Sequence, residues 1–226
     1  MDSTVKICGL SSPETLDAAL GAGADMVGFV FFEKSPRFVG LDHARTLAEQ
    51  ARGIAKIVAL SVDPSDRMLA AIVRALAPDF LQLHGSEGPE RVMEIRRLFE
   101  IPTIKAIGVA GAEDFSRADE YSETADWLLI DAKPPQGAVL PGGNGVPFEW
   151  RLAQAFAPSK PWLLSGGLDP ENVAEAIALS GARGVDVSSG VESAPGVKDA
   201  AKIARFVARA RAAFAMMKFV PSGEQA

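Results

Sequence analysis

Short runs of β-branched and aliphatic residues recur along the whole chain about every 25 residues, the length expected of one strand and one helix with short connections. This repeat limits the choice of fold more than any other feature of the sequence. Eight runs are expected to form strands: Val5 to Cys8, Met26 to Phe31, Lys56 to Ser61, Phe80 to Leu83, Thr103 to Ile107, Trp127 to Ile130, Trp162 to Leu164 and Gly184 to Val187.

Alanine-rich amphipathic stretches lie between these runs and are expected to form helices. A further helix is expected around Glu149 to Phe156, after a stretch rich in glycine and proline from Lys133 to Val146 that is expected to be a lid or binding loop. Three helices are predicted to start where a capping side chain precedes proline: Ser12-Pro13-Glu14, Asp63-Pro64 and Asp169-Pro170-Glu171.

Strict alternation of strands and helices predicts parallel strands, because a parallel crossover needs a connection of about a dozen residues. The runs are apolar throughout, as expected for strands buried on both faces. Eight units in 226 residues favour a closed α/β barrel, the (β/α)8 or TIM barrel, over an open doubly wound sheet, because closure leaves no exposed edge. No linker divides the chain, so residues 1–217 are expected to form one domain and 218–226 a flexible tail.

Composition excludes several classes of function. The formal net charge is −6 and no run of lysine or arginine breaks it, so neither a nucleic acid nor an anionic membrane is an expected partner. No signal peptide or membrane span is indicated, and a cytoplasmic protein is expected. Cys8 cannot form an internal disulfide, and with only His43 and His84 it makes a poor set of metal ligands, so no metal is expected.

Active sites of such barrels lie at the carboxyl ends of the strands, where polar residues therefore carry the most information. Glycines and serines follow the last two strands, and backbone N–H groups in such loops commonly hold a phosphate. The alternative is that these glycines only relieve strain in turns. The predicted phosphate site comprises Ser165, Gly166, Gly167, Ser188, Ser189 and Gly190.

Cys8 ends the first run and Asp131 directly follows the sixth, so the two are expected on opposite sides of the barrel mouth. A small substrate between them could exchange a proton with each side, which suits an isomerisation. Taken alone, Cys8 could equally be a small core residue, and Asp131 could cap a helix or fix a loop. Lys6 points the same way as Cys8 and is the nearest group that could help the thiol lose its proton.

Two further side chains at strand ends are candidates for binding the substrate. Arg37 follows the second strand and could clamp a carboxylate with its planar fork, although an arginine in a polar loop is often only solvated. His84 ends the fourth strand and is a minor candidate, because a single histidine there could simply hydrogen-bond within the core.

In these residues the chain resembles phosphoribosylanthranilate isomerase over nearly its full length. Matching blocks in the same order are far more specific than any single motif. They are KICGL (6–10), GADMVGFVFFEKSPRFV (23–39), LQLHG (81–85), LLIDAK (128–133), GGNGVPFEW (142–150), LSGGLDPENV (164–173) and GVDVSSGVE (184–192).

The resemblance implies an Amadori rearrangement of N-(5-phosphoribosyl)anthranilate to 1-(2-carboxyphenylamino)-1-deoxyribulose 5-phosphate in tryptophan biosynthesis, without cofactor or metal, by a monomer or homodimer. It implies that Asp131 protonates the furanose ring oxygen and that Cys8 removes the proton from C2. It also implies that Arg37 holds the anthranilate carboxylate and that the segment Gly142, Gly143, Asn144 and Gly145 closes over the site. Glu149 departs from the aspartate or asparagine common in the family before Trp150, which puts the docking of that loop in doubt.

Two rival functions remain open at this point. A sister barrel, such as indole-glycerol-phosphate synthase or a ribulose-phosphate epimerase, would share the phosphate site, but the catalytic lysine and glutamates of the first and the metal-binding histidines of the second are not found. A non-catalytic phosphosugar-binding barrel would lack the acid or the base, whereas Cys8 and Asp131 are both present.

Overall fold

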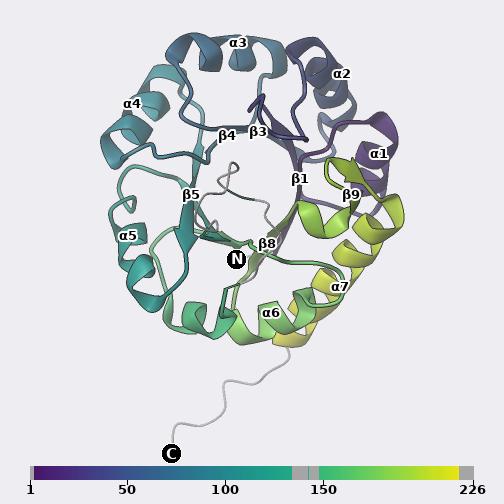
Figure 1. The fold of residues 1–226 in the computed structure, drawn as a ribbon, viewed down its shortest axis with the longest axis vertical. Coiled ribbons are helices and arrows are strands. Elements are labelled where there is room, and N and C mark those ends of the chain that lie inside the picture. Colours follow the sequence, from purple (N-terminus) through teal and green to yellow (C-terminus); the bar gives the residue numbers. More distant parts are fainter. Residues whose placement is uncertain (1–2, 134–141, 143–147, 219–226) are drawn as a thin grey trace, which may run out of the picture.

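The computed structural model describes residues 3–133, 142 and 148–218, and in it eight parallel strands form a closed barrel with helices around the outside (Figure 1). The strands are β1 (Thr4–Cys8), β2 (Met26–Val30), β3 (Lys56–Ser61), β4 (Phe80–Leu83), β5 (Thr103–Val109), β6 (Trp127–Ala132), β7 (Trp162–Leu164) and β8 (Gly184–Val187). Each strand lies within two residues of the run predicted for it, so the predicted TIM barrel is confirmed.

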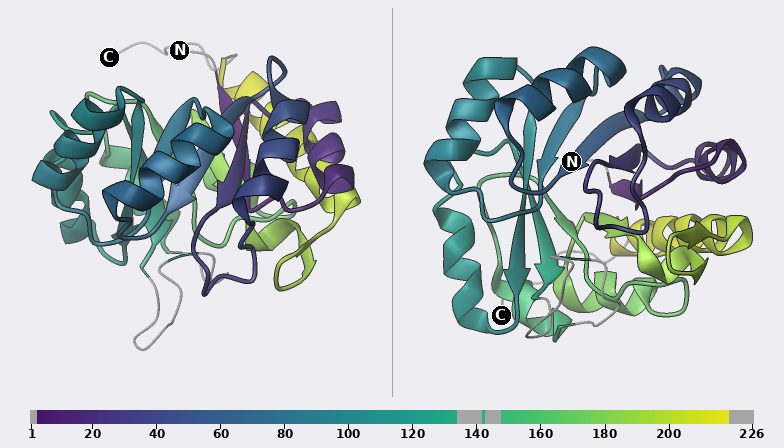
Figure 2. Two further views of the ribbon diagram at one scale, coloured as in Figure 1. Left: turned by 90° about the horizontal axis from the view of Figure 1, so that it is seen from above. Right: turned by 45° about the horizontal axis from the view of Figure 1, so that its top comes forward.

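The helices form a ring that covers the outer face of the barrel, as the tilted view in Figure 2 shows. They are α1 (Pro13–Gly21), α2 (Leu41–Ala51), α3 (Asp66–Leu76), α4 (Pro89–Phe99), α5 (Ser116–Asp119), α6 (Val173–Ser180) and α7 (Ala200–Lys218), with 3-10 helices η1 (Ala112–Phe115), η2 (Trp150–Ala155) and η3 (Ser189–Val191). A short antiparallel hairpin of β9 (Glu192–Ala194) and β10 (Val197–Lys198) lies between η3 and α7.

Apolar side chains fill the barrel towards the amino ends of its strands. One buried cluster there consists of Met26, Val58, Ile104, Ala106, Leu129 and Leu163, with Phe80 and Trp127 packed against it. A second, smaller cluster of Cys8, Val30 and Leu60 lies further along the strands. The first cluster therefore fills the barrel interior on the side away from the carboxyl ends of the strands.

The barrel closes where its first strand pairs with its last, but the joints between neighbouring strands, meaning their paired residues, differ in number. Four residue pairs join β1 to β8, from Thr4↔Gly184 to Ile7↔Val187. Six pairs join β5 to β6, whereas β7 and β8 share the single pair Leu164↔Val185. The least extensive joint of the barrel therefore lies between the two strands whose following loops form the predicted phosphate site.

The start predicted for the first helix is confirmed, because Ser12 caps α1 through a bond from the Thr15 N–H and Pro13 is its first residue. The start predicted at Asp63 is wrong. Asp63 has a left-handed backbone (φ 45°) and its carboxylate accepts from Ser86 across the neighbouring loop, so Ser65 caps α3 instead.

Two further predictions about helices are wrong in detail. The Asp169 carboxylate accepts from the N–H groups of Glu171 and Asn172 within a turn, and α6 begins only at Val173. The helix predicted around residues 149–156 is the 3-10 helix η2, a six-residue turn followed closely by Pro158.

The helix α7 continues to Lys218, the first residue of the expected tail, and residues 219–226 lie outside the described part of the chain. Among the helices of residues 3–133 and 148–218, none combines the length and apolar character that crossing a membrane requires.

Candidate active site

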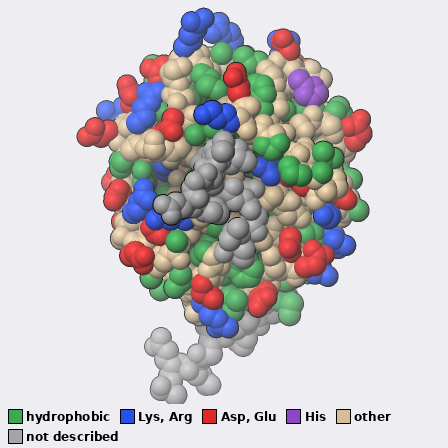
Figure 3. Space-filling model, in the orientation of Figure 1, with side chains coloured by type: hydrophobic (Ala, Val, Ile, Leu, Met, Phe, Trp, Pro, Cys, Tyr) green, Lys and Arg blue, Asp and Glu red, His purple; other side chains and the backbone are tan. Residues whose placement is uncertain are grey.

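A pocket opens at the carboxyl ends of the strands, on the face seen in Figure 3. Charged side chains of both signs are scattered over this face (Figure 3). The pocket is lined by Cys8, Val30, Phe32, Ser35, Arg37, Leu60, Val62, His84, Asp131, Ala132, Lys133, Gly142, Ser165, Gly166, Gly167, Leu168, Asp186, Val187, Ser188 and Ser189.

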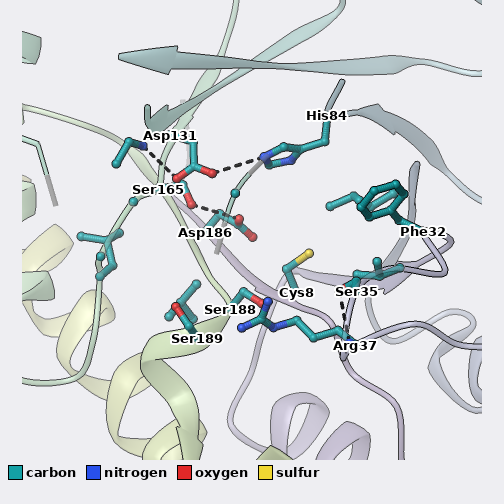
Figure 4. Close-up of a pocket in the computed structure, with 18 of the residues that line it drawn as sticks. Cys8, Phe32, Ser35, Arg37, His84, Asp131, Ser165, Asp186, Ser188 and Ser189 are labelled. Carbon is teal, nitrogen blue, oxygen red and sulfur yellow. Dashed lines mark hydrogen bonds and ion pairs between the residues drawn. The ribbon is translucent and has the colours of Figure 1, made fainter. Parts of the chain in front are cut away.

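Asp131 lies near the end of β6 and is 4% exposed, with its carboxyl facing the pocket (Figure 4). Its Oδ1 accepts from the Ala132 N–H at 2.9 Å, and its Oδ2 lies 3.2 Å from Nε2 of His84. The amide nitrogen of Gln82 lies 2.9 Å from Nδ1 of the same imidazole. Since that amide donates to Nδ1, a neutral His84 carries its proton on Nε2 and donates it to Oδ2 of Asp131.

Gly142 lies directly against this acid. A Cβ atom at Gly142 would come within 2.5 Å of both Oδ2 of Asp131 and Nε2 of His84, which no side chain tolerates without displacing them. The backbone of Gly142 therefore packs directly against the carboxyl. Gly143, Asn144 and Gly145, the other residues of the predicted loop over the site, lie outside the described residues.

Cys8 is 3% exposed at the end of β1, and its sulfur faces the same pocket (Figure 4). Burial raises the pKa of the Cys8 thiol above its ordinary value, and the positive charge of Lys6 opposes this rise without cancelling it. The neutral thiol is therefore the main form of Cys8 near pH 7. A base at this position works through a minor thiolate population that nearby cations increase.

Lys6 is completely buried beneath Cys8 and donates to Oδ1 of Asp186 at 2.8 Å. Oδ2 of Asp186 in turn accepts from the Ser165 hydroxyl at 3.3 Å. Burial alone would lower the pKa of Lys6, but Asp186 and Cys8 together raise it above its ordinary value, so the ammonium stays charged. Lys6 thus acts on the site through Asp186 and Cys8, since its own side chain does not line the pocket.

Arg37, in the loop after β2, is held by a carboxylate of the protein itself. Its Nε and Nη2 donate to the two oxygens of Glu192 at 2.6 and 2.9 Å. The resulting ion pair is buried, with exposed fractions of 7% and 4% for the two side chains. Arg37 still lines the pocket, and its Nη1 makes no hydrogen bond to another side chain that the structure describes.

The loops after β7 and β8 meet at the pocket. Gly166 and Gly167 both have positive φ (83° and 65°), and a Cβ at Gly166 would lie 2.5 Å from the Ala132 nitrogen. Turn strain therefore accounts for their presence. It does not account for their N–H groups, which, like that of Ser189, donate to no other residue of the described chain. These free donors are available to an anion.

The pocket brings together most of the residues predicted from the sequence, from Cys8 and Asp131 to the two glycine- and serine-rich loops. Gly190 does not line it, because this residue packs against the Leu168 carbonyl. Asp186 lines the pocket and was missed, although it is a charged residue in an apolar strand, the signal that identified Asp131. In the described ranges, no three His, Cys, Asp or Glu side chains are placed to share a metal ion.

Comparisons with known proteins agree with this geometry. Residues 5–209 match the family model described as N-(5'phosphoribosyl)anthranilate (PRA) isomerase. The N-(5'-phosphoribosyl)anthranilate isomerase of Rhodopseudomonas palustris (strain HaA2) is 55% identical over 212 residues, which cover 94% of this chain and 97% of the relative.

Two solved structures extend the likeness to the fold. The phosphoribosyl anthranilate isomerase of Thermotoga maritima has a TM-score of 0.84 and 34% identity, over 93% of this chain and 99% of that one. A crystal structure of such an isomerase in complex with reduced 1-(o-carboxyphenylamino)-1-deoxyribulose 5-phosphate has a TM-score of 0.79 and 33% identity, with the same coverage.

Proposed function

This chain belongs to the N-(5'-phosphoribosyl)anthranilate isomerase family and is an enzyme of that activity, and we propose that Cys8 is its general base and Asp131 its general acid. The observation that carries this assignment is that one pocket holds a buried thiol, a buried carboxyl and two loops with free N–H groups. The substrate then is N-(5-phosphoribosyl)anthranilate, an intermediate of tryptophan biosynthesis. The cytoplasmic location and the monomeric or homodimeric state predicted from the sequence stay predictions.

The substrate has an anionic group at each end, and the pocket offers a matching donor at each side. The phosphate is proposed to lie between the loops of Gly166, Gly167 and Ser189, whose N–H groups have no partner in the described chain. The anthranilate carboxylate is proposed to bind Nη1 of Arg37, because Glu192 occupies the other edge of that guanidinium. Held at both ends, the ribose lies between Cys8 and Asp131.

In the first step Asp131 gives its proton to the furanose ring oxygen, and the nitrogen lone pair of the substrate expels that oxygen from C1. The ring opens to an iminium ion and Asp131 becomes a carboxylate. The Ala132 N–H and the Nε2–H of His84 both donate to this carboxylate, so the charge formed in the step is stabilised where it appears.

In the second step the Cys8 thiolate takes the proton from C2. The iminium withdraws electrons from that C–H bond, so a base of moderate strength is sufficient, and the product is an enolamine that tautomerises to the ketone. Lys6 and Lys198 lower the pKa of Cys8 by their charge and so increase the thiolate fraction that burial would otherwise suppress.

The proposal is tested by adding freshly prepared substrate to the purified chain and following the loss of its anthranilate fluorescence, with and without a chelator. Turnover that survives the chelator is expected, because the assigned chemistry uses only side chains. A chain that binds the substrate without consuming it would instead be the non-catalytic phosphosugar-binding barrel considered from the sequence. Turnover that the chelator abolishes would contradict the assigned acid and base.

A further inference from the structure

A buried network of charged side chains lies behind the pocket wall and consists of Arg37, Glu192 and Lys198. Figure 4 shows Arg37 and, from the loop after β8, Ser188 at this wall. The β9–β10 hairpin supplies Glu192 and Lys198, and its register places these two residues directly opposite each other. Neither of these two residues lines the pocket. Any effect of theirs on the reaction must therefore pass through the groups they hold.

Every hydrogen-bonding position of the pair is used within the protein. Oε1 of Glu192 accepts from Nε of Arg37 and from Nζ of Lys198, at 2.6 and 2.7 Å. Its Oε2 accepts from Nη2 of Arg37 and from the Gly196 N–H, at 2.9 and 3.1 Å. Lys198 uses its other two protons on the carbonyl and hydroxyl oxygens of Ser188, at 2.8 and 3.2 Å.

These bonds connect the two subsites that are proposed to hold the opposite ends of the substrate. Arg37 follows β2 and is assigned to the carboxylate, whereas Ser188 follows β8 and belongs to the phosphate loops. The strands β2 and β8 flank β1, which carries Cys8. The chain from Arg37 through Glu192 and Lys198 to Ser188 therefore spans the strand of the general base.

Stability alone is a weak explanation for such a network. The Lys198 and Glu192 side chains are 1% and 4% exposed, and well-packed apolar residues in place of a buried ion pair are often no less stable. Directional bonds to two loops, in contrast, fix where those loops lie. The network is suited to setting geometry.

We propose that Lys198 and Glu192 are positioning residues for the isomerisation, which fix the Arg37 guanidinium and the Ser188 loop relative to each other and so set the distance between the carboxylate and phosphate subsites. This inference rests on the proposed function for the identity of the two subsites. The charge of Lys198 has a second effect on the site, since it lowers the pKa of the Cys8 thiol.

The main test is Lys198→Met, which keeps most of the length of the side chain and removes all three bonds. The expected result is a KM raised roughly tenfold to a hundredfold, the order of loss that follows a small displacement of binding groups. Inhibition by inorganic phosphate and inhibition by anthranilate should both weaken, because the network holds both subsites. Lys56→Met is the control for loss of a lysine away from the site: it removes an exposed ammonium from the Lys56–Asp79 pair at the amino end of β3 and should leave KM unchanged.

The Arg37→Met background separates the two subsites. Adding Lys198→Met to Arg37→Met should not weaken anthranilate inhibition further, because Lys198 reaches that subsite only through Glu192 and Arg37. Phosphate inhibition should still weaken. If the two changes instead act independently on anthranilate inhibition, the proposed linkage is wrong.

A pH series on a chain that keeps Lys198 does not depend on whether Lys198→Met folds. Burial lowers the pKa of Lys198 to about 8, although Glu192 opposes the shift. The other charged groups around it are Arg37 and Cys8, and the Lys202 ammonium from α7 binds the Glu192 carbonyl at 2.7 Å. Above pH 8 Lys198 loses its proton, so binding of the reduced reaction product should weaken there.

Measuring that binding in a Cys8→Ala background removes the competing effect of a thiolate on an anionic ligand. Binding to the Cys8→Ala chain that is flat from pH 7 to 10 would overturn the proposal, as would a folded Lys198→Met chain whose KM and two inhibition constants stay within twofold of the parent. A parent chain that binds both fragments but does not turn over substrate would contradict the proposed function and leave this inference to be judged on binding.

Discussion

The two sides of the pocket are built on different electrostatic principles. Around Asp131 the hydrogen-bond partners are an imidazole oriented by Gln82 and a backbone N–H, neither of which carries a permanent charge. Around Cys8 the buried side chains are charged, with one more positive than negative group. They are Lys6, Asp186, Arg37, Glu192 and Lys198.

This contrast follows from what each side must do. A general acid must hold a proton until the substrate takes it, and a neighbouring cation would drive that proton off too early. Burial keeps the Cys8 thiol mainly neutral, so this general base needs nearby cations to increase the fraction of thiolate. The site thus separates a neutral half from a charged half, and changes on the two halves should have different kinetic signatures.

The largest expected effect comes from removing the acid or the base. Cys8→Ala and Asp131→Asn should each lower kcat by about a hundredfold to ten-thousandfold, the usual worth of a positioned proton-transfer group. Steady-state turnover measured by fluorescence checks this, with circular dichroism to confirm folding. A variant whose kcat stays near that of the parent would show that its residue has no such role.

Removing a cation from the charged half should have the next largest effect. Lys6→Met takes away the nearest charge that lowers the pKa of Cys8, so kcat at neutral pH should fall by about tenfold or more, and the pH dependence of Cys8 alkylation by iodoacetamide should move to higher pH.

Lys105→Met is the matched control for Lys6→Met. It removes an equally buried ammonium, 3% exposed and paired with Glu87, that makes no bond to the Cys8 side of the pocket. Its pH dependence should match that of the parent. A Lys6→Met profile identical to the parent's would exclude a role for Lys6 in tuning the thiol.

The pH dependence of the parent itself reports on the charged half. Burial raises the pKa of Cys8, and the thiolate is the reactive form, so alkylation of this single cysteine by iodoacetamide should speed up as pH rises from 6.5 and level off only above the ordinary thiol value of about 8.5. The alkylation rate should rise about tenfold per pH unit on the lower limb. An alkylation rate that is constant from pH 6.5 to 8.5 would mean that the thiol is already ionised.

The smallest effect is expected on the neutral half. Gln82→Met removes the donor that holds the proton of His84 on Nε2, so the bond from His84 to Asp131 weakens. We expect kcat to fall by less than about tenfold, the scale of one neutral hydrogen bond, with no shift of the pH profile. A shift comparable to that of Lys6→Met would mean that the two halves are electrostatically coupled.

The sequence was sufficient for the barrel and for the residues at its strand ends, because both depend on local patterns. Asp131 stands at the end of an apolar run, and the glycines follow two consecutive runs. Asp186 carries a similar signal, since a carboxylate within a buried strand needs a partner, and Lys6 provides it from the adjacent strand.

The network behind the pocket wall could not be predicted in the same way. Glu192 and Lys198 lie beyond the last barrel strand, and their partner Arg37 is 155 residues away from Glu192 in the sequence. Nothing in the local pattern shows that Glu192 would occupy one edge of that guanidinium. The helix predicted to start at Asp63 failed for a related reason, because Ser86 in the neighbouring loop takes the carboxylate that was expected to cap it.

The single residue pair between β7 and β8 gives the ligand a mechanical role as well as a chemical one. An anion held by both following loops would tie these two strands together from above, so local opening at this joint should become rarer in the complex. Ligand binding should then slow amide exchange more in β7 and β8 than in the other strands of the barrel. In this enzyme the phosphate would thus reinforce the pairing of β7 with β8, which has the fewest paired residues of any two neighbouring strands in the barrel.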